Sequence, residues 1–175
     1  MGMSKIDTRL YGKMDYKRAR YVFNRDYAVM QALFVDSKAE KIAGQATATL
    51  QTSQISMIIR HIRRGQEINI PGKLPKIIET EKGKCLTTTI FVNYNYDIDN
   101  DENRLITIKV AALPNGYLQE IYNPTTNDTI WKAGRDAPTL GEEFRVRLAF
   151  EKLKSKMSWR IQTIPMSPNN FIWDD

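Results

Sequence analysis

The chain has 175 residues, a formal net charge of +6 and 42% hydrophobic residues, which is enough to fold as one domain. Its apolar runs are too short for a membrane span, and its N-terminus lacks the apolar segment of a secretory signal. The single cysteine, Cys85, excludes an intramolecular disulfide, so the composition predicts a reducing, cytoplasmic location.

Residues 1–25 form a basic segment in which aromatic residues are interleaved with cations. The segment contains seven lysines and arginines but only two aspartates. Cations contact phosphates and aromatic rings stack on bases, so this pattern predicts an arm that binds nucleic acid. The candidate contacts in the arm are Lys13, Lys17, Arg18, Arg20 and Tyr21. The alternative is that the aromatic residues pack in the core.

The next elements along the chain are predicted to be a strand and a helix. Residues 27–35 favour a strand, and residues 37–42 a turn or short helix that ends at Gly44. A clearer helix follows, because isoleucines recur at helical spacing from Ile55 to Ile62 and Gly65 stands where a helix commonly ends. Three arginines near its C-terminal end complement the helix dipole and are also candidates for phosphate contact: Arg60, Arg63 and Arg64.

From residue 86 onward the pattern changes to the alternation that is typical of strands. Segments 86–96, 106–110, 144–150 and 157–162 alternate apolar and polar residues, and turn residues separate several of them. A turn at residues 114–116 leads to a further short segment, 117–122. The predicted core contains Ile90, Val92, Ile106, Ile108, Val110, Phe144, Val146, Leu148 and Phe150. The fold class is therefore mainly β with one or two helices, either a small antiparallel OB-like barrel or a helix-covered sheet. The predicted organisation is a basic arm (1–25), one β-rich domain (26–165) and a flexible tail (166–175).

The β-rich part carries further candidates for nucleic-acid contact. Arg145 and Arg147 share the strand face opposite Val146 and Leu148, and a basic connection follows them. The remaining candidates are Tyr94, Tyr96, Trp131, Lys132, Lys152, Lys154, Lys156 and Arg160. A basic sheet studded with aromatic rings is suited to single strands. The alternative is an ordinary solvated face with Trp159 in the core.

No catalytic constellation is recognised in the sequence. One histidine, His61, and one cysteine, Cys85, do not make a zinc site, and we expect both to be dispensable for activity. The acidic segment 97–102 has the spacing of a calcium loop at its start, but it lacks the required glycine and the final glutamate. A solvated acidic turn is therefore expected there. The prediction is a non-enzymatic protein without metal or cofactor, although a metal-dependent nuclease with paired carboxylates stays open.

In layout, the chain resembles the OB-fold single-stranded-DNA-binding proteins of phages and conjugative plasmids. The features that carry this resemblance are the small size, the β-rich centre from Leu86 to Ile164, the basic N-terminal extension and the tail that ends Phe171-Ile-Trp-Asp-Asp175. The resemblance implies coverage of single-stranded DNA with little sequence preference, homo-oligomers formed through the terminal arms, and a tail that recruits a protein partner. Two alternatives are a capsid-like protein that packages nucleic acid and an inhibitor module that binds a protein.

Overall fold

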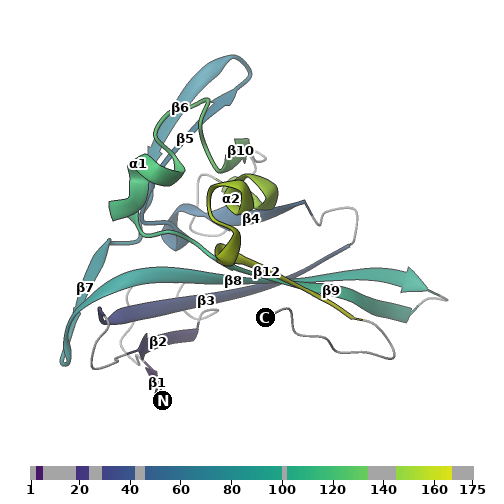
Figure 1. The fold of residues 1–175 in the computed structure, drawn as a ribbon, viewed down its shortest axis with the longest axis horizontal. Helices are drawn as coiled ribbons and strands as arrows, with labels where there is room; N and C mark the ends of the chain where they lie inside the picture. The colour runs from purple at the N-terminus through teal and green to yellow at the C-terminus, as the bar shows by residue number, and fades with distance from the viewer. Residues whose placement is uncertain are drawn as a thin grey trace.

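The computed structural model describes residues 3–5, 19–23, 29–41, 46–99, 102–133 and 145–166, with only the backbone for residues 3–5, 19–23 and Asp99. Three open sheets dominate these residues (Figure 1). The strands are β1 (Met3–Lys5), β2 (Ala19–Phe23), β3 (Gln31–Lys41), β4 (Thr47–Gln51), β5 (Ile58–Arg63), β6 (Gln66–Pro71), β7 (Ile77–Thr80), β8 (Gly83–Asp99), β9 (Glu102–Ala112), β10 (Trp131–Ala133), β11 (Arg145–Ala149) and β12 (Ile161–Pro165). Two short helices, α1 (Gln119–Tyr122) and α2 (Phe150–Lys156), complete the described elements together with three 3-10 turns. The prediction of a mainly β fold with few helices is confirmed, but the described sheets are open, so the antiparallel OB-like barrel that was one of the two predicted architectures is wrong.

The largest sheet has seven strands in the order β1-β2-β3-β8-β9-β12, with β7 also paired to β8. Strands β3 and β8 are parallel, whereas the other pairs in this sheet are antiparallel. A second sheet has the order β10-β11-β4, and β5 and β6 form a separate hairpin. Figure 1 shows that α2 and the two smaller sheets lie on the same side of the large sheet.

The main core lies between the large sheet and the β10-β11-β4 sheet. Val146, Leu148 and Phe150 are buried in it, as predicted, and Trp131 packs in the same cluster. The predicted alternation of β11 is also confirmed, because Arg145 and Arg147 are only half-buried on the opposite face. Phe144 lies outside the described residues.

The prediction for β8 and β9 placed the wrong face inside. Ile90, Val92, Ile106, Ile108 and Val110 are only half-buried, whereas the alternate β8 residues are fully buried. These buried residues are Thr87, Thr89, Phe91, Asn93 and Asn95. Because side chains alternate along a strand, choosing the other face inverts every assignment. The buried face of β8 is therefore the more polar one.

The helix predicted between Ile55 and Gly65 is a β-hairpin. After a 3-10 turn at Thr52–Gln54, strand β5 runs from Ile58 to Arg63, so that Ile59 and His61 are buried while Ile58 and Ile62 are exposed. Arg64 and Gly65 both have positive φ, 49° and 77°, and they form the two-residue turn between β5 and β6. Paired positive φ values are typical of a tight hairpin turn, which explains the glycine.

Several other boundaries also differ from the sequence prediction. Residues 37–41, expected in a turn or helix, continue strand β3. Segment 117–122, expected as a strand, contains a 3-10 turn and α1, and the basic connection at 152–156 is part of α2. No helix in the described part of the chain is both long and apolar enough to cross a membrane.

Leu148 provides a direct test of this core. Its side chain is completely buried, next to the equally buried Leu50 and Trp131. We expect Leu148→Ala to lower the free energy of unfolding by about 2–5 kcal/mol, because it removes apolar contacts and leaves a cavity. Urea denaturation measures this loss. The surface change Ile62→Ala is the control, and a Leu148→Ala protein that is as stable as this control would contradict the assigned core.

Candidate functional site

Strand β3 changes from apolar to charged along one face. Ala32 and Phe34 are buried in its first half, and the same face continues with Asp36, Lys38 and Glu40, all of which are half-buried. The period of two along a strand places these five side chains in one row. We call the face formed by Asp36, Lys38, Glu40 and the neighbouring Asn93 and Asn95 the polar face.

Asp36 and Lys38 contact each other directly. The Lys38 ammonium lies 3.2 Å from Asp36 Oδ2 and donates a hydrogen bond to the Thr49 carbonyl oxygen at 2.5 Å. It also lies 5.5 Å from the centroid of the Phe91 ring. The carboxylate is the more enclosed partner, with 13% of the Asp36 side chain exposed against 32% for Lys38. A carboxylate and an ammonium group are thus held in contact at the edge of the core.

Glu40 extends the polar face towards β11. Burial raises the pKa of its carboxyl group, and the positive charges of Lys38 and Arg147 partly oppose this shift. The positive charge of Arg147, on β11, therefore affects the pKa of Glu40, on β3.

Glu40→Gln should stabilise the protein at neutral pH. A raised pKa in the folded state means that folding disfavours the Glu40 carboxylate, and this cost is present in full above the folded-state pKa. It disappears below the ordinary glutamate pKa of 4.5, where both folded and unfolded states are protonated. Thermal melts across pH should therefore show a higher Tm for Glu40→Gln at pH 7 and equal values under acid conditions. A lower Tm for the variant at pH 7 would contradict the assignment.

A second charged surface is formed by the outer side of the β10-β11-β4 sheet. Lys132 is opposite Arg147 in the register, and Arg147 is opposite Thr49, so their side chains share a face. Arg145 lies on that face two residues earlier. We call Lys132, Arg145 and Arg147 the basic face. Thr49 joins it to the polar face, because the Thr49 carbonyl accepts the hydrogen bond from Lys38.

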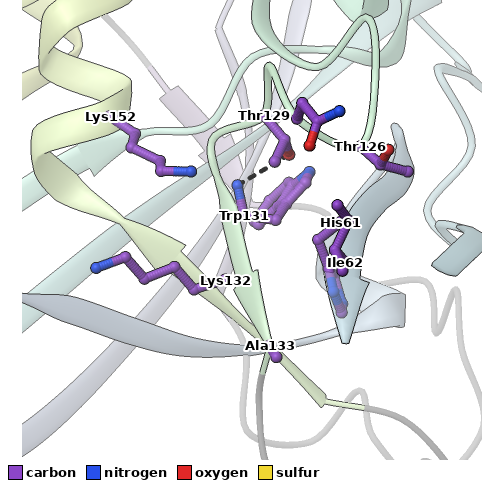
Figure 2. Close-up of a pocket in the computed structure, with 9 residues that line it drawn as sticks. His61, Ile62, Thr126, Thr129, Trp131, Lys132, Ala133 and Lys152 are labelled. Atoms are coloured by element: carbon purple, nitrogen blue, oxygen red, sulfur yellow. Dashed lines mark hydrogen bonds between the residues drawn. The ribbon is translucent and has the colours of Figure 1, made fainter. Parts of the chain in front are cut away.

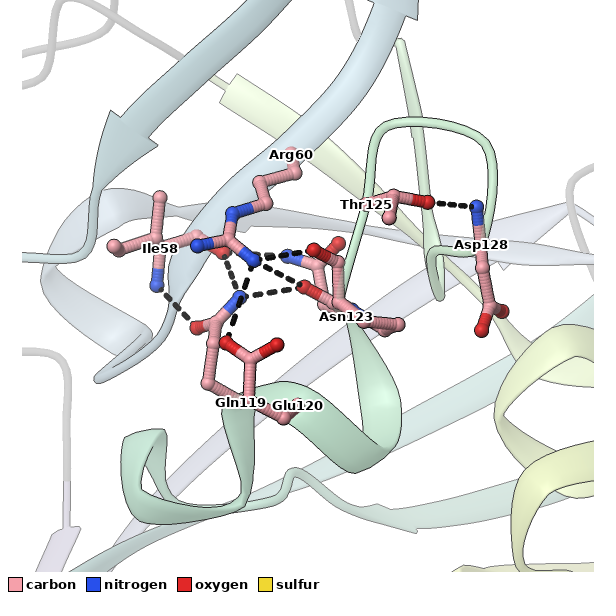
Figure 3. Close-up of polar contacts among 8 residues, drawn as sticks. Ile58, Arg60, Gln119, Glu120, Asn123, Thr125 and Asp128 are labelled. Carbon is pink, nitrogen blue, oxygen red and sulfur yellow. Dashed lines mark hydrogen bonds and ion pairs between the residues drawn. The ribbon is translucent and has the colours of Figure 1, made fainter.

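Arg60, a candidate for phosphate contact, has a structural role (Figure 3). Its guanidinium donates hydrogen bonds to the carbonyl oxygens of Asn123 and Pro124 and lies 3.5 Å from a Glu120 carboxylate oxygen. The Gln119 side chain bonds the backbone N–H and carbonyl of Ile58 in the same cluster. These contacts attach the β5–β6 hairpin to α1, while Arg63 is half-buried and Arg64 is exposed in the hairpin turn.

Trp131 and His61 lie in the interior, although both line one pocket (Figure 2). Only 1% of Trp131 is exposed, so its ring is unavailable for base stacking, which corrects the prediction. Its backbone N–H donates to Thr129 Oγ1 at 3.1 Å. His61 is 2% exposed, and burial lowers its pKa. This burial favours a structural role for His61.

Arg160 is also buried, and two of its nitrogen atoms donate hydrogen bonds within the protein. Its Nε donates to Tyr122 Oη at 2.6 Å, Nη1 donates to the Ala112 carbonyl at 3.2 Å, and its guanidinium stacks on Trp159. Arg160 therefore fixes the chain after α2 and is unsuited to nucleic-acid contact, which corrects that prediction. Trp159, which the alternative interpretation placed in the core, is 66% exposed.

The remaining candidates are dispersed. Tyr94 and Tyr96 lie on the side of the large sheet opposite the polar face, because they alternate with Asn93 and Asn95. On α2, Lys152 and Lys154 are exposed, and Lys156 pairs with Asp128 at 2.6 Å. Lys13, Lys17 and Arg18 lie outside the described residues, as do the side chains of Arg20 and Tyr21.

The Asp36–Lys38 pair was not among the candidates predicted from the sequence. Assigning residues 37–42 to a turn or helix separated the two side chains, whereas strand β3 places them on one face. The available signal was the alternation itself, in which Ala32, Phe34, Asp36, Lys38 and Glu40 follow one another at every second position. In the described residues, no three potential metal-ligating side chains gather in one place.

Comparison with known proteins identifies relatives. A family model described as "Type II restriction enzyme SfiI" matches residues 1–164. The type II restriction enzyme SfiI of Streptomyces fimbriatus is 31% identical over 176 residues, an alignment that covers 94% of this chain and 65% of that protein. The chain therefore spans slightly less than two thirds of this relative.

Two solved structures have the same fold. The tetrameric restriction endonuclease SfiI bound to cognate DNA matches with a TM-score of 0.76 and 26% identity over 95% of this chain and 65% of that one. The restriction endonuclease BglI bound to its DNA recognition sequence matches with a TM-score of 0.73 over 94% of this chain and 65% of that one. Its identity is 18%, so this second match shows the fold alone.

These matches contradict the expected function. The chain is not a relative of the OB-fold single-stranded-DNA-binding proteins of phages and plasmids, because its family model is that of a restriction enzyme. The expectations of a non-enzymatic protein and of a single-stranded nucleic-acid partner are wrong for the same reason. Over most of its length, and in its fold, the chain belongs to the family of the type II restriction enzyme SfiI.

Proposed function

We propose that this protein is a sequence-specific endonuclease that hydrolyses double-stranded DNA. The observation that carries the proposal is the contact between Asp36 and Lys38 on one face of β3, beside the basic face, in a chain of the SfiI family. Hydrolysis of a phosphodiester requires a group that activates water and a positive charge that stabilises the transition state. The carboxylate and the ammonium at the polar face are suited to these two tasks. DNA is an intracellular substrate, so the cytoplasm is the proposed location.

The chemistry of Asp36 fits a divalent cation. Among the described residues, the buried Oδ2 atom of Asp36 has no partner apart from the Lys38 ammonium, and a carboxylate oxygen is a preferred ligand of Mg²⁺. Mg²⁺ commonly uses only one or two protein carboxylates, together with water and substrate phosphates. When bound, such a cation lowers the pKa of a water molecule and offsets phosphate charge.

Lys38 supplies a positive charge next to this carboxylate. An ammonium group has three N–H donors, and the Thr49 carbonyl holds one of them in place. The hydrogen bond orients the Lys38 side chain, so the ammonium group is already held in position before the substrate binds. We propose that Lys38 donates to an oxygen of the scissile phosphate and stabilises the negative charge that develops there.

The basic face is the proposed surface for reading the DNA sequence. Arginine binds guanine through two parallel hydrogen bonds in the major groove, and a β-ribbon fits into that groove. Arg145 and Arg147 are half-buried on one strand, which limits their freedom, and Lys132 lies opposite Arg147. Thr49 connects this surface to Lys38. Recognition and cleavage would therefore occur on one continuous surface.

Digestion of a long duplex DNA of mixed sequence tests the proposal. The wild-type protein with Mg²⁺ should produce discrete fragments, and the protein with EDTA should produce none. The Asp36→Asn protein should bind the same DNA and cut it at least about 100-fold more slowly, so that no fragments are visible when the wild-type digest is complete. Failure to cut any duplex, with Mg²⁺ or Mn²⁺, by a protein that binds DNA would refute the endonuclease proposal.

A further inference from the structure

Asn93 is a buried side chain that has no hydrogen-bond partner within the part of the chain that the structure describes. The residue is 0% exposed, and neither its Oδ1 nor its Nδ2 atom makes a hydrogen bond to a described residue. Two residues on the same face of β8 are buried yet satisfied, since Thr87 donates to the Pro75 carbonyl and Thr89 donates to the Gln54 carbonyl. Along this face of β8, Asn93 is therefore the first buried polar residue whose side chain lacks hydrogen bonds to described residues, and it is also the first residue of β8 that belongs to the polar face.

Asn93 adjoins the proposed cleavage site. In the parallel pairing of β3 with β8, Asn93 is the register partner of Lys38, and Phe91 is the partner of Asp36. Adjacent strands are about 4.8 Å apart, so partners on one face lie side by side. On the other flank of β8, Asn93 is opposite Lys109, whose pKa is lowered mainly by burial. The carboxamide thus stands between two lysines.

Lys38 has one more donor than its contacts with the described residues use. Its ammonium has three N–H groups, and its polar contacts are with the Thr49 carbonyl and the Asp36 carboxylate. If Asp36 binds a cation in the loaded enzyme, its attraction for Lys38 weakens, and the ammonium needs another acceptor to remain oriented. Asn93 Oδ1 is a buried acceptor without a donor on the neighbouring strand.

We propose that Asn93 is a positioning residue of the Asp36–Lys38 site, and that its Oδ1 accepts a hydrogen bond from the Lys38 ammonium when DNA is bound. This inference rests on the proposed endonuclease function. An unsatisfied buried amide reduces stability, and such local costs are typical of functional sites. In the loaded enzyme, the contact with Lys38 satisfies the carboxamide oxygen and fixes the ammonium beside the scissile phosphate.

The proposal predicts opposite effects of one substitution on stability and cleavage. Asn93→Leu replaces the unsatisfied carboxamide by an apolar side chain of similar size, and should raise the Tm by about 2–4 °C. The same change should slow single-turnover cleavage about 10–100-fold, the usual effect of removing a residue that orients a ligand group. The Kd for a cleavable duplex, measured with EDTA, should change less than twofold, since Asn93 is not at the DNA surface.

Two further variants separate positioning from a general packing effect. Thr89→Val removes a buried donor from the same face of β8, and should lower the Tm while leaving cleavage unchanged well below the melting temperature. Asn93→Asp keeps an oxygen acceptor next to Lys38, and should cleave faster than Asn93→Leu.

The outcomes distinguish this inference from the function on which it rests. A wild-type protein that cuts no DNA would overturn the endonuclease itself. A wild-type enzyme that cuts, with an Asn93→Leu variant that is equally fast, would overturn only the role of Asn93. An Asn93→Leu variant that loses stability and cleavage together, with no recovery in Asn93→Asp, would also reject it, because a packing defect produces that result.

Discussion

We expect Asp36→Asn and Lys38→Ala each to reduce the rate of duplex cleavage by about 10²–10³-fold or more, the usual loss when one preorganised charge is removed from a reacting centre. Asp36→Asn removes the charge of the proposed cation ligand while preserving the shape of the side chain. Lys38→Ala removes the ammonium that the Thr49 carbonyl orients. Single-turnover kinetics with saturating protein measure both losses without interference from product release.

The control for this prediction is Lys154→Ala, which removes an equally charged group from the exposed surface of α2. We expect this variant to cleave at the wild-type rate. Asp36→Asn and Lys38→Ala should keep their fold and their affinity for duplex DNA within a few fold. Wild-type cleavage rates in either variant would exclude the pair from the chemistry.

Arg147→Ala should have its largest effect on sequence discrimination. If Arg147 makes a two-bond contact with a guanine, its loss costs about 1–3 kcal/mol at that base pair and relaxes specificity there. Binding to unrelated duplexes should change much less. Affinities for the cognate duplex and for single-base variants of it, measured at one salt concentration with EDTA, give this comparison.

Lys132→Ala is the matched control, because Lys132 lies opposite Arg147 on the basic face. A lysine that contacts a phosphate should contribute equally to every sequence. Its removal should reduce the slope of log affinity against log salt by about 0.9, with no change in base preference. If Arg147→Ala also weakens all sequences equally, Arg147 contacts the backbone rather than a base.

The burial of side chains could be predicted from the sequence where apolar residues alternate with charged ones along a strand. Val146, Leu148 and Phe150 were predicted to be buried, and Arg145 and Arg147 were predicted on the opposite face, because apolar and charged residues separate cleanly along β11. On β8 the same reasoning selected the wrong face. The polar side chains there are nevertheless buried, because Thr87 and Thr89 donate to backbone carbonyls, while Asn93 and Asn95 belong to the polar face.

The two other main errors have local physical causes. The isoleucines between Ile55 and Ile62 satisfy helical spacing, yet they are β-branched and the positive φ values of Arg64 and Gly65 make a hairpin turn. The charged second half of β3 lacks apolar alternation and so resembled a turn. Once residues 37–41 are placed in the strand, Asp36, Lys38 and Glu40 lie in one row, and the candidate site can be recognised from the sequence.

The most direct test of the central claim is to sequence the ends of DNA fragments produced from a random-sequence duplex library. We predict that wild-type protein with Mg²⁺ generates ends that share one short recognition sequence, and that Asp36→Asn protein, prepared in parallel, generates none. Ends distributed without sequence preference, or equal numbers of ends from wild-type and Asp36→Asn protein, would contradict the assignment of sequence-specific cleavage to the Asp36–Lys38 site.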